Sequence, residues 1–106
     1  MRGKGLADAR VIDVSKSTRF VEENLENLVL HFLRGQAMSQ HEIVQDILSR
    51  HGVSVSQRKM GMLLGSLKER GLVEERKREL LTTYALTDEG RKTAEQVRFD
   101  ELKTLL

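Results

Sequence analysis

The residues with recognisable binding chemistry lie between Ser54 and Gly90. This segment reads as a polar helix start, a basic helix, a Gly-Leu-Val stop, a charged hairpin and a Tyr-x-Leu-Thr-x-x-Gly entry into another helix. Its serine, glutamine, arginine and lysine side chains are the types that contact phosphates and base edges. This order of parts would present one helix and one β-ribbon to a nucleic acid.

The charges of the chain are unevenly distributed, although the net charge is only +2. Residues 20–49 hold one basic residue against five acids, a net charge of −4. Residues 50–78 hold eight basic residues against three acids, a net charge of +5. A charge run more often only solvates a helix, but here the basic block coincides with the helix and the ribbon. The pattern therefore favours a polyanionic partner.

The sequence offers no constellation for catalysis or metal binding. It has no cysteine, no Gly-rich phosphate loop and no His-x-x-x-His pair, and His31, His41 and His51 fall on different predicted elements. The adjacent carboxylates of Asp88 and Glu89 point to different sides of a helix, so they cannot act as an acid–base pair. We therefore expect no enzyme activity, no cofactor and no metal.

Length and composition indicate one domain, or one domain with a helical tail, because the chain has 106 residues. The absence of cysteine excludes a disulfide framework and a zinc ribbon. The apolar run 28–30 is too short to span a bilayer, and residues 1–10 have no signal-peptide core. We expect a cytoplasmic, nucleoid-associated protein without membrane contact.

The first two helices are predicted from apolar periodicity and from caps. A single stripe of period 3.6 predicts a helix from Ser17 or Thr18 to Gly35, after a flexible arm over residues 1–16. The stripe consists of Val21, Leu25, Leu28, Val29, Phe32 and Leu33. Ser39 and Glu42 have the spacing of a capping box and predict a second helix that ends at Gly52. Its inward face is predicted to hold Ile43, Ile47 and Leu48.

The third helix is predicted to follow after a tight turn. It starts at Ser54 or Ser56, either of which could cap it, and Gly71 stops it. Its buried stripe is predicted to hold Met60, Leu63, Leu64 and Leu67. Two short helices joined by a tight Gly-containing turn indicate a helix-turn-helix arrangement.

The rest of the chain is predicted as a hairpin and a final helix. Strands are expected over residues 72–77 and 81–86 with the tip at residues 78–80, and Thr87 caps the last helix. That helix carries a second apolar face after residue 97, which predicts a dimerisation element over residues 91–106; the alternative is a tail that covers the core. The face consists of Phe99, Leu102, Leu105 and Leu106. The fold class is mostly α with a small β-hairpin, in the order α-α-α-β-β-α.

Two strings in this order resemble a known group of regulators. Met60-x-x-Leu63-Leu64-x-x-Leu67-x-x-x-Gly71-Leu72-Val73 and Tyr84-x-Leu86-Thr87-x-x-Gly90 are similar to the recognition-helix and wing segments of MarR-type and PadR-type winged helix-turn-helix regulators. The resemblance covers roughly residues 18–97, and residues 17–90 would form the domain. It implies that the third helix enters the major groove of DNA, that the wing contacts the backbone and that terminal helices pair two subunits.

Nine residues are candidates for contact with DNA. Arg58 is the candidate for guanine and Gln57 for adenine, because these pairings are common in the major groove. The serines suit phosphates, Lys59 suits a positioning contact, and the wing residues suit the backbone or the minor groove. The full set is Ser54, Ser56, Gln57, Arg58, Lys59, Met62, Arg76, Lys77 and Arg78. Double-stranded DNA and a second subunit are the expected partners, and no residue identifies a small-molecule effector.

Two features depart from this pattern. Gly61 and Gly65 are costly within a helix, by about 1 kcal/mol each relative to alanine. Either a backbone approaches closely there, from a phosphate, the wing or a second subunit, or the glycines are simply tolerated. Leu80 and Leu81 are unusually apolar for a DNA-facing ribbon. As anchors for a protein partner, they indicate the alternative function, a winged-helix module that binds protein without reading DNA.

Overall fold

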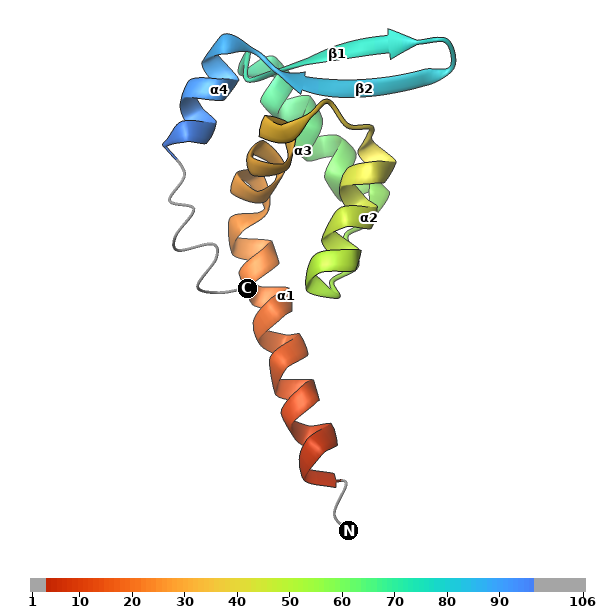
Figure 1. The fold of residues 1–106 in the computed structure, drawn as a ribbon, viewed down its shortest axis with the longest axis vertical. Coiled ribbons are helices and arrows are strands. Elements are labelled where there is room, and N and C mark those ends of the chain that lie inside the picture. Colours follow the sequence, from red (N-terminus) through yellow and green to blue (C-terminus); the bar gives the residue numbers. More distant parts are fainter. Residues whose placement is uncertain (1–3, 97–106) are drawn as a thin grey trace.

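The structure, a computed structural model, describes the backbone of residues 4–96 and the side chains of residues 17–96. Its elements are α1 (Lys4–Gly35), α2 (Gln40–His51), α3 (Gln57–Glu69), β1 (Val73–Arg78), β2 (Leu81–Leu86) and α4 (Asp88–Glu95). Figure 1 shows α1 between α2 and α4, with the β1–β2 hairpin across one end of the helices. The predicted α-α-α-β-β-α winged-helix order is confirmed.

The first helix begins earlier than the sequence indicated. It starts at Lys4 rather than near Ser17 or Thr18, and its N-terminal part extends beyond the other elements in Figure 1. No proline interrupts this region, and several of its residues are good helix formers. The division of the chain at residues 16 and 90 stays a prediction.

A local irregularity marks the middle of α1. Asn24 has non-helical angles, φ −121° and ψ 19°, and its Nδ2 donates to the carbonyl oxygen of Phe20 at 2.9 Å. In a regular helix this carbonyl oxygen would accept a hydrogen bond from a backbone N–H. Here it accepts one from the asparagine side chain, which is how asparagine competes with helical hydrogen bonding. Helix α1 therefore has a kink at Asn24, and core residues lie on both sides of it.

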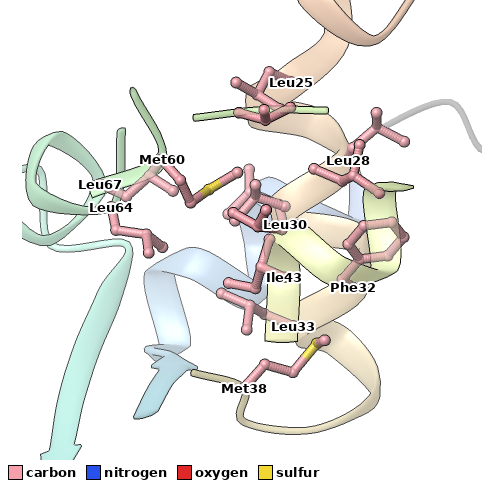
Figure 2. Packing of buried hydrophobic residues seen from close by; sticks show 14 of the residues in the cluster. Leu25, Leu28, Leu30, Phe32, Leu33, Met38, Ile43, Met60, Leu64 and Leu67 are labelled. Carbon is pink, nitrogen blue, oxygen red and sulfur yellow. The ribbon is translucent and has the colours of Figure 1, made fainter. Parts of the chain in front are cut away.

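The predicted stripe of α1 is buried, and the helix buries more than that stripe. Leu30, which lies on the far side at 100° per residue, has no exposed surface. This follows from the position of α1, which contacts α2, α4 and β2. Figure 2 shows Leu30 among side chains from several elements in the centre of the core.

The capping box predicted for α2 is present. Glu42 N–H donates to Ser39 Oγ at 3.2 Å, and Ser39 N–H donates to Glu42 Oε1 at 2.8 Å. Gly52 ends the helix with a left-handed φ of 68°. The inward position assigned to Leu48 was wrong, because its side chain is 43% exposed. Val44 is buried instead, since the buried face is centred on Ile43 and Ile47 and leaves Leu48 at its edge.

The hairpin is a regular two-stranded antiparallel ribbon. Val73 pairs with Leu86 at its base and Arg78 with Leu81 at its end, which leaves Glu79 and Leu80 as the turn. The first strand is shifted by one residue from the predicted range. Backbone hydrogen bonds in both directions between Met38 and Tyr84 connect the ribbon to the segment before α2. The base of the wing is therefore fixed to the helical core.

Candidate nucleic-acid interface

Helix α3 is attached to the domain through one face and leaves the opposite face open. The attached face has three residues with no exposed surface, Met60, Leu64 and Leu67, which Figure 2 shows packed into the core. Leu63, predicted in the same stripe, is only partly buried. Arg58 and Met62 lie on the exposed side, and Met62 is 68% exposed. The packing of the buried face into the core therefore fixes the direction in which the exposed face of α3 points.

The two cations at the start of α3 are available to a partner. Arg58 and Lys59 are exposed, and neither forms an ion pair within the part of the chain that the structure describes. The arginine fork can bind a phosphate or a guanine edge in bidentate fashion. Burial of Arg58 and Lys59 against the protein itself would have excluded contact with DNA. In the structure both side chains are exposed.

Of the two serines considered as caps, Ser56 is the N-cap. Its Oγ accepts a hydrogen bond from Lys59 N–H at 3.0 Å. Ser54 is exposed in the turn between α2 and α3. The Ser56 hydroxyl is thus already used as an acceptor, whereas its own proton and the Ser54 hydroxyl are suited to a phosphate.

The side chain of Gln57 is held by a residue that the sequence analysis missed. Gln40 Nε2 donates to the carbonyl oxygen of Gln57 at 2.7 Å and to Gln57 Oε1 at 2.9 Å. The Gln57 amide NH₂ group and the second lone pair of Oε1 stay available, so this bond orients the side chain expected to read adenine. No local sequence signal identifies Gln40, because 17 residues separate the pair.

Within the described residues, two of the three wing cations form no ion pair. Arg76 Nε lies 3.5 Å from Glu74 Oε2, so its charge is partly compensated. Lys77 and Arg78 are exposed and form no ion pair among the described residues. Both lie at the end of the ribbon away from the core, where a backbone phosphate could be reached.

An ion pair links the wing to α3. Lys68 and Glu75 form this pair across the two elements. The hydrogen bond and the charge of Lys68 hold the pKa of Glu75 below its ordinary value, and the same contacts raise the pKa of Lys68. One acid of the wing is therefore neutralised by α3, which lessens the negative charge near the wing cations.

The wing tip is apolar and open. Leu80 is fully exposed (104%) and Leu81 is 52% exposed. Glu79 adopts a left-handed φ of 55° in the two-residue turn, a conformation that usually selects glycine, asparagine or aspartate. Nothing in the described core requires leucine at these positions.

The glycines of α3 have different surroundings, and among the described residues no backbone atom from another element is nearest to either one. A Cβ added at Gly61 would lie 3.2 Å from Gln40 Oε1, a side-chain atom. A Cβ added at Gly65 would meet nothing within 4 Å. The wing is thus excluded as the reason for either glycine. The close backbone approach occurs instead at Gly90, where a Cβ would collide with the carbonyl oxygen of Leu72.

A small hollow lies behind the start of α3. It is lined by α1 and the α2–α3 turn and includes Val21, Leu25, Val55 and Lys59. Its volume of about 230 Å³ is below the roughly 300–1,000 Å³ of typical small-molecule sites. We therefore assign no effector to it.

Several expectations fall outside what the structure describes. The dimerisation residues Phe99, Leu102, Leu105 and Leu106 lie beyond residue 96, so the pairing of subunits stays a prediction. Across residues 4–96, no helix is long and apolar enough to cross a membrane. The described side chains also form no cluster of three or more potential metal ligands.

Comparison with solved structures places this arrangement among known folds. A PadR family transcription regulator from Clostridium difficile R20291 has a TM-score of 0.63 at 19% identity, over 68% of this chain and 80% of that chain. A transcriptional regulator from Clostridium thermocellum has a TM-score of 0.68 at 18% identity, over 82% and 87% of the two chains. H. salinarum RosR, in the hsRosR-S1 complex, has a TM-score of 0.62 at 25% identity, over 74% and 68%.

The structural neighbours are winged-helix transcriptional regulators. The predicted resemblance to PadR-like proteins is confirmed at the level of structure. No protein-family model and no curated protein matches the sequence. The similarity to these structures shows the winged-helix fold.

Proposed function

We propose that this protein is a sequence-specific, double-stranded-DNA-binding transcription regulator that acts as a homodimer. Helix α3 reads the major groove, and the β1–β2 wing contacts the neighbouring backbone. The observation that carries this proposal is the pair of exposed cations, Arg58 and Lys59. Neither forms an ion pair with the described residues, and both lie on a helix fixed by its opposite face.

The geometry of α3 supports a reading role. The major groove of B-DNA accepts one α-helix, and in helix-turn-helix proteins the N-terminal residues of the second helix contact base edges. Arg58 is the second residue of α3 and points away from the core. Its guanidinium matches the two acceptors of guanine, while Lys59 and the serines before it suit phosphates.

The wing supports a second, sequence-independent contact. Lys77 and Arg78 are exposed at the far end of the ribbon, whose base is tied to the core through Met38 and Tyr84. Cations at the end of an anchored ribbon can neutralise phosphates without reading bases. We expect their removal to weaken binding to all sequences alike.

Pairing of two subunits would determine the form of the target. Dimeric helix-turn-helix proteins place their two reading helices about one DNA turn apart. The target is then a near-palindrome with half-sites about 10 base pairs apart. The residues proposed for pairing lie at 99–106, and the cytoplasmic, nucleoid-associated location belongs to the same proposal.

The test begins with selection of bound duplexes from a random pool at two salt concentrations. Arg58→Ala should lower affinity for the selected site by about 1–3 kcal/mol and relax the preference at one base pair. Arg91→Ala is the matched control, because it removes an exposed arginine from α4 rather than from α3. Duplex binding that does not depend on salt, or that is unchanged in Arg58→Ala on every sequence, would contradict the proposal.

One observation favours a second function, a protein-binding module without DNA reading. Leu80 and Leu81 form an exposed apolar wing tip that the described core does not use. A protein complex held by these residues would survive high salt, whereas phosphate contacts weaken steeply with ionic strength. Gel filtration with and without duplex, in low and high salt, separates the two functions, and Leu80→Asp would disrupt only the protein complex.

A further inference from the structure

The exposed face of α3 carries an apolar residue about one turn after two cations. Met62 is 68% exposed and lies one helical turn after Arg58. A methionine in this position contributes nothing to the core and exposes apolar surface to water. Arg58 and Lys59, four and three residues before Met62, form no ion pair with the described residues, so the N-terminal side of the surface around Met62 suits an anionic partner.

The major groove contains one apolar group that such a residue can recognise. Among the base edges presented there, only thymine carries a methyl group, at C5. Methionine is flexible and polarisable, so it adapts to a small apolar surface. Resting on the proposed function, we propose that Met62 is a specificity-determining residue that contacts the C5-methyl group of a thymine in each half-site.

The spacing on α3 fixes where that thymine lies. Arg58 and Met62 are four residues apart, which corresponds to about 6 Å along the helix axis. Base pairs along one strand are about 3.4 Å apart. The thymine is therefore within about two base pairs of the guanine that Arg58 reads.

Gly65 lowers the helix surface beside Met62. It follows Met62 by three residues, so the two are neighbours on the helix. A Cβ at Gly65 would meet no atom within 4 Å, so the described part of this chain gives no reason for glycine there. Gly61 differs, because the Gln40 side chain lies over it. The absence of a side chain at Gly65 allows base edges to approach the Met62 thioether.

The test uses the full chain and the best duplex from the random selection. Each thymine is replaced in turn by deoxyuridine, which removes only the C5-methyl group, and affinity is measured for wild type, Met62→Ala and Leu80→Ala. In wild type, one replacement per half-site should weaken binding by about fourfold, the equivalent of one buried methylene-sized group. In Met62→Ala the same replacement should have no effect.

Leu80→Ala is the matched control. It removes an exposed apolar side chain from the wing tip rather than from α3, so the uracil effect should persist in full. The proposal is overturned if wild type is indifferent to every uracil replacement, or if Met62→Ala keeps the same sensitivity. Failure to select any duplex would overturn the proposed function as well, whereas selection of a duplex without methyl dependence would overturn only the role of Met62.

Discussion

Two identical glycine-to-alanine changes should have opposite effects on the stability of this protein. In Gly90→Ala the new Cβ would collide with the carbonyl oxygen of Leu72 and lie 3.2 Å from Leu86 Cδ2. The Leu72 carbonyl cannot move freely, because it accepts a hydrogen bond from Thr87 N–H at 3.1 Å. Both helix α4 and the start of the wing must therefore shift to accommodate one methyl group.

The magnitudes follow from the surroundings of each site. Alanine in place of glycine stabilises a helix interior by about 1 kcal/mol. At Gly90 this gain is opposed by about 1–3 kcal/mol of overpacking and about 1 kcal/mol for the strained hydrogen bond. Gly90→Ala should thus lower the free energy of unfolding by about 2 kcal/mol. Gly65→Ala has open space around its Cβ and should raise that free energy by about 1 kcal/mol.

Urea unfolding of the full chain, followed by circular dichroism, measures both changes. The two variants should differ by about 3 kcal/mol at an unchanged m-value, which separates their melting temperatures by about 10–20 °C. Gly65→Ala should also bind the selected duplex more weakly than wild type, so its stability and affinity change in opposite directions. The reasoning is refuted if Gly90→Ala is as stable as wild type, or if both variants shift in the same direction.

Two further predictions concern a helix cap and a histidine. Ser39→Ala removes the N-cap of α2 and should cost about 1 kcal/mol in thermal or urea unfolding, whereas Ser49→Ala, on the exposed side of the same helix, should be nearly neutral; equal losses in both would argue against the cap. Burial, followed by the charge of Arg50, lowers the pKa of His51 below its ordinary value. Below about pH 6.5 the unfolded chain binds more protons at this position than the folded protein does. The contribution of neutral His51 to the free energy of unfolding is therefore complete above about pH 6.5 and is lost as the pH falls through the lower folded pKa. Between pH 7 and pH 5, the free energy of unfolding should fall less in His51→Gln than in wild type or in His41→Gln, the control at an exposed histidine. An identical pH dependence in all three proteins would contradict a role for His51.

Local signals in the sequence determined the boundaries that depend on nearby residues. The capping box of α2, the left-handed Gly52 and the Thr87 cap were all predicted, because each joins groups within about four residues. The burial of Met60, Leu64 and Leu67 in α3 was predicted for the same reason, since their spacing follows from helical periodicity. The order of elements, and with it the winged-helix fold, followed from these signals.

Only the tertiary structure decided which side chains meet across elements. Periodicity predicted that Leu48 is buried and did not predict that Leu30 is buried. The burial of a helical residue depends on which other elements pack around its helix at that position, and the sequence pattern does not give this. The contact of Gln40 with Gln57 and the approach of the Leu72 carbonyl to Gly90 join residues 17 and 18 positions apart. Such contacts arise only when the chain folds back on itself, so no local pattern encodes them, yet they decide how α3 and the wing are held.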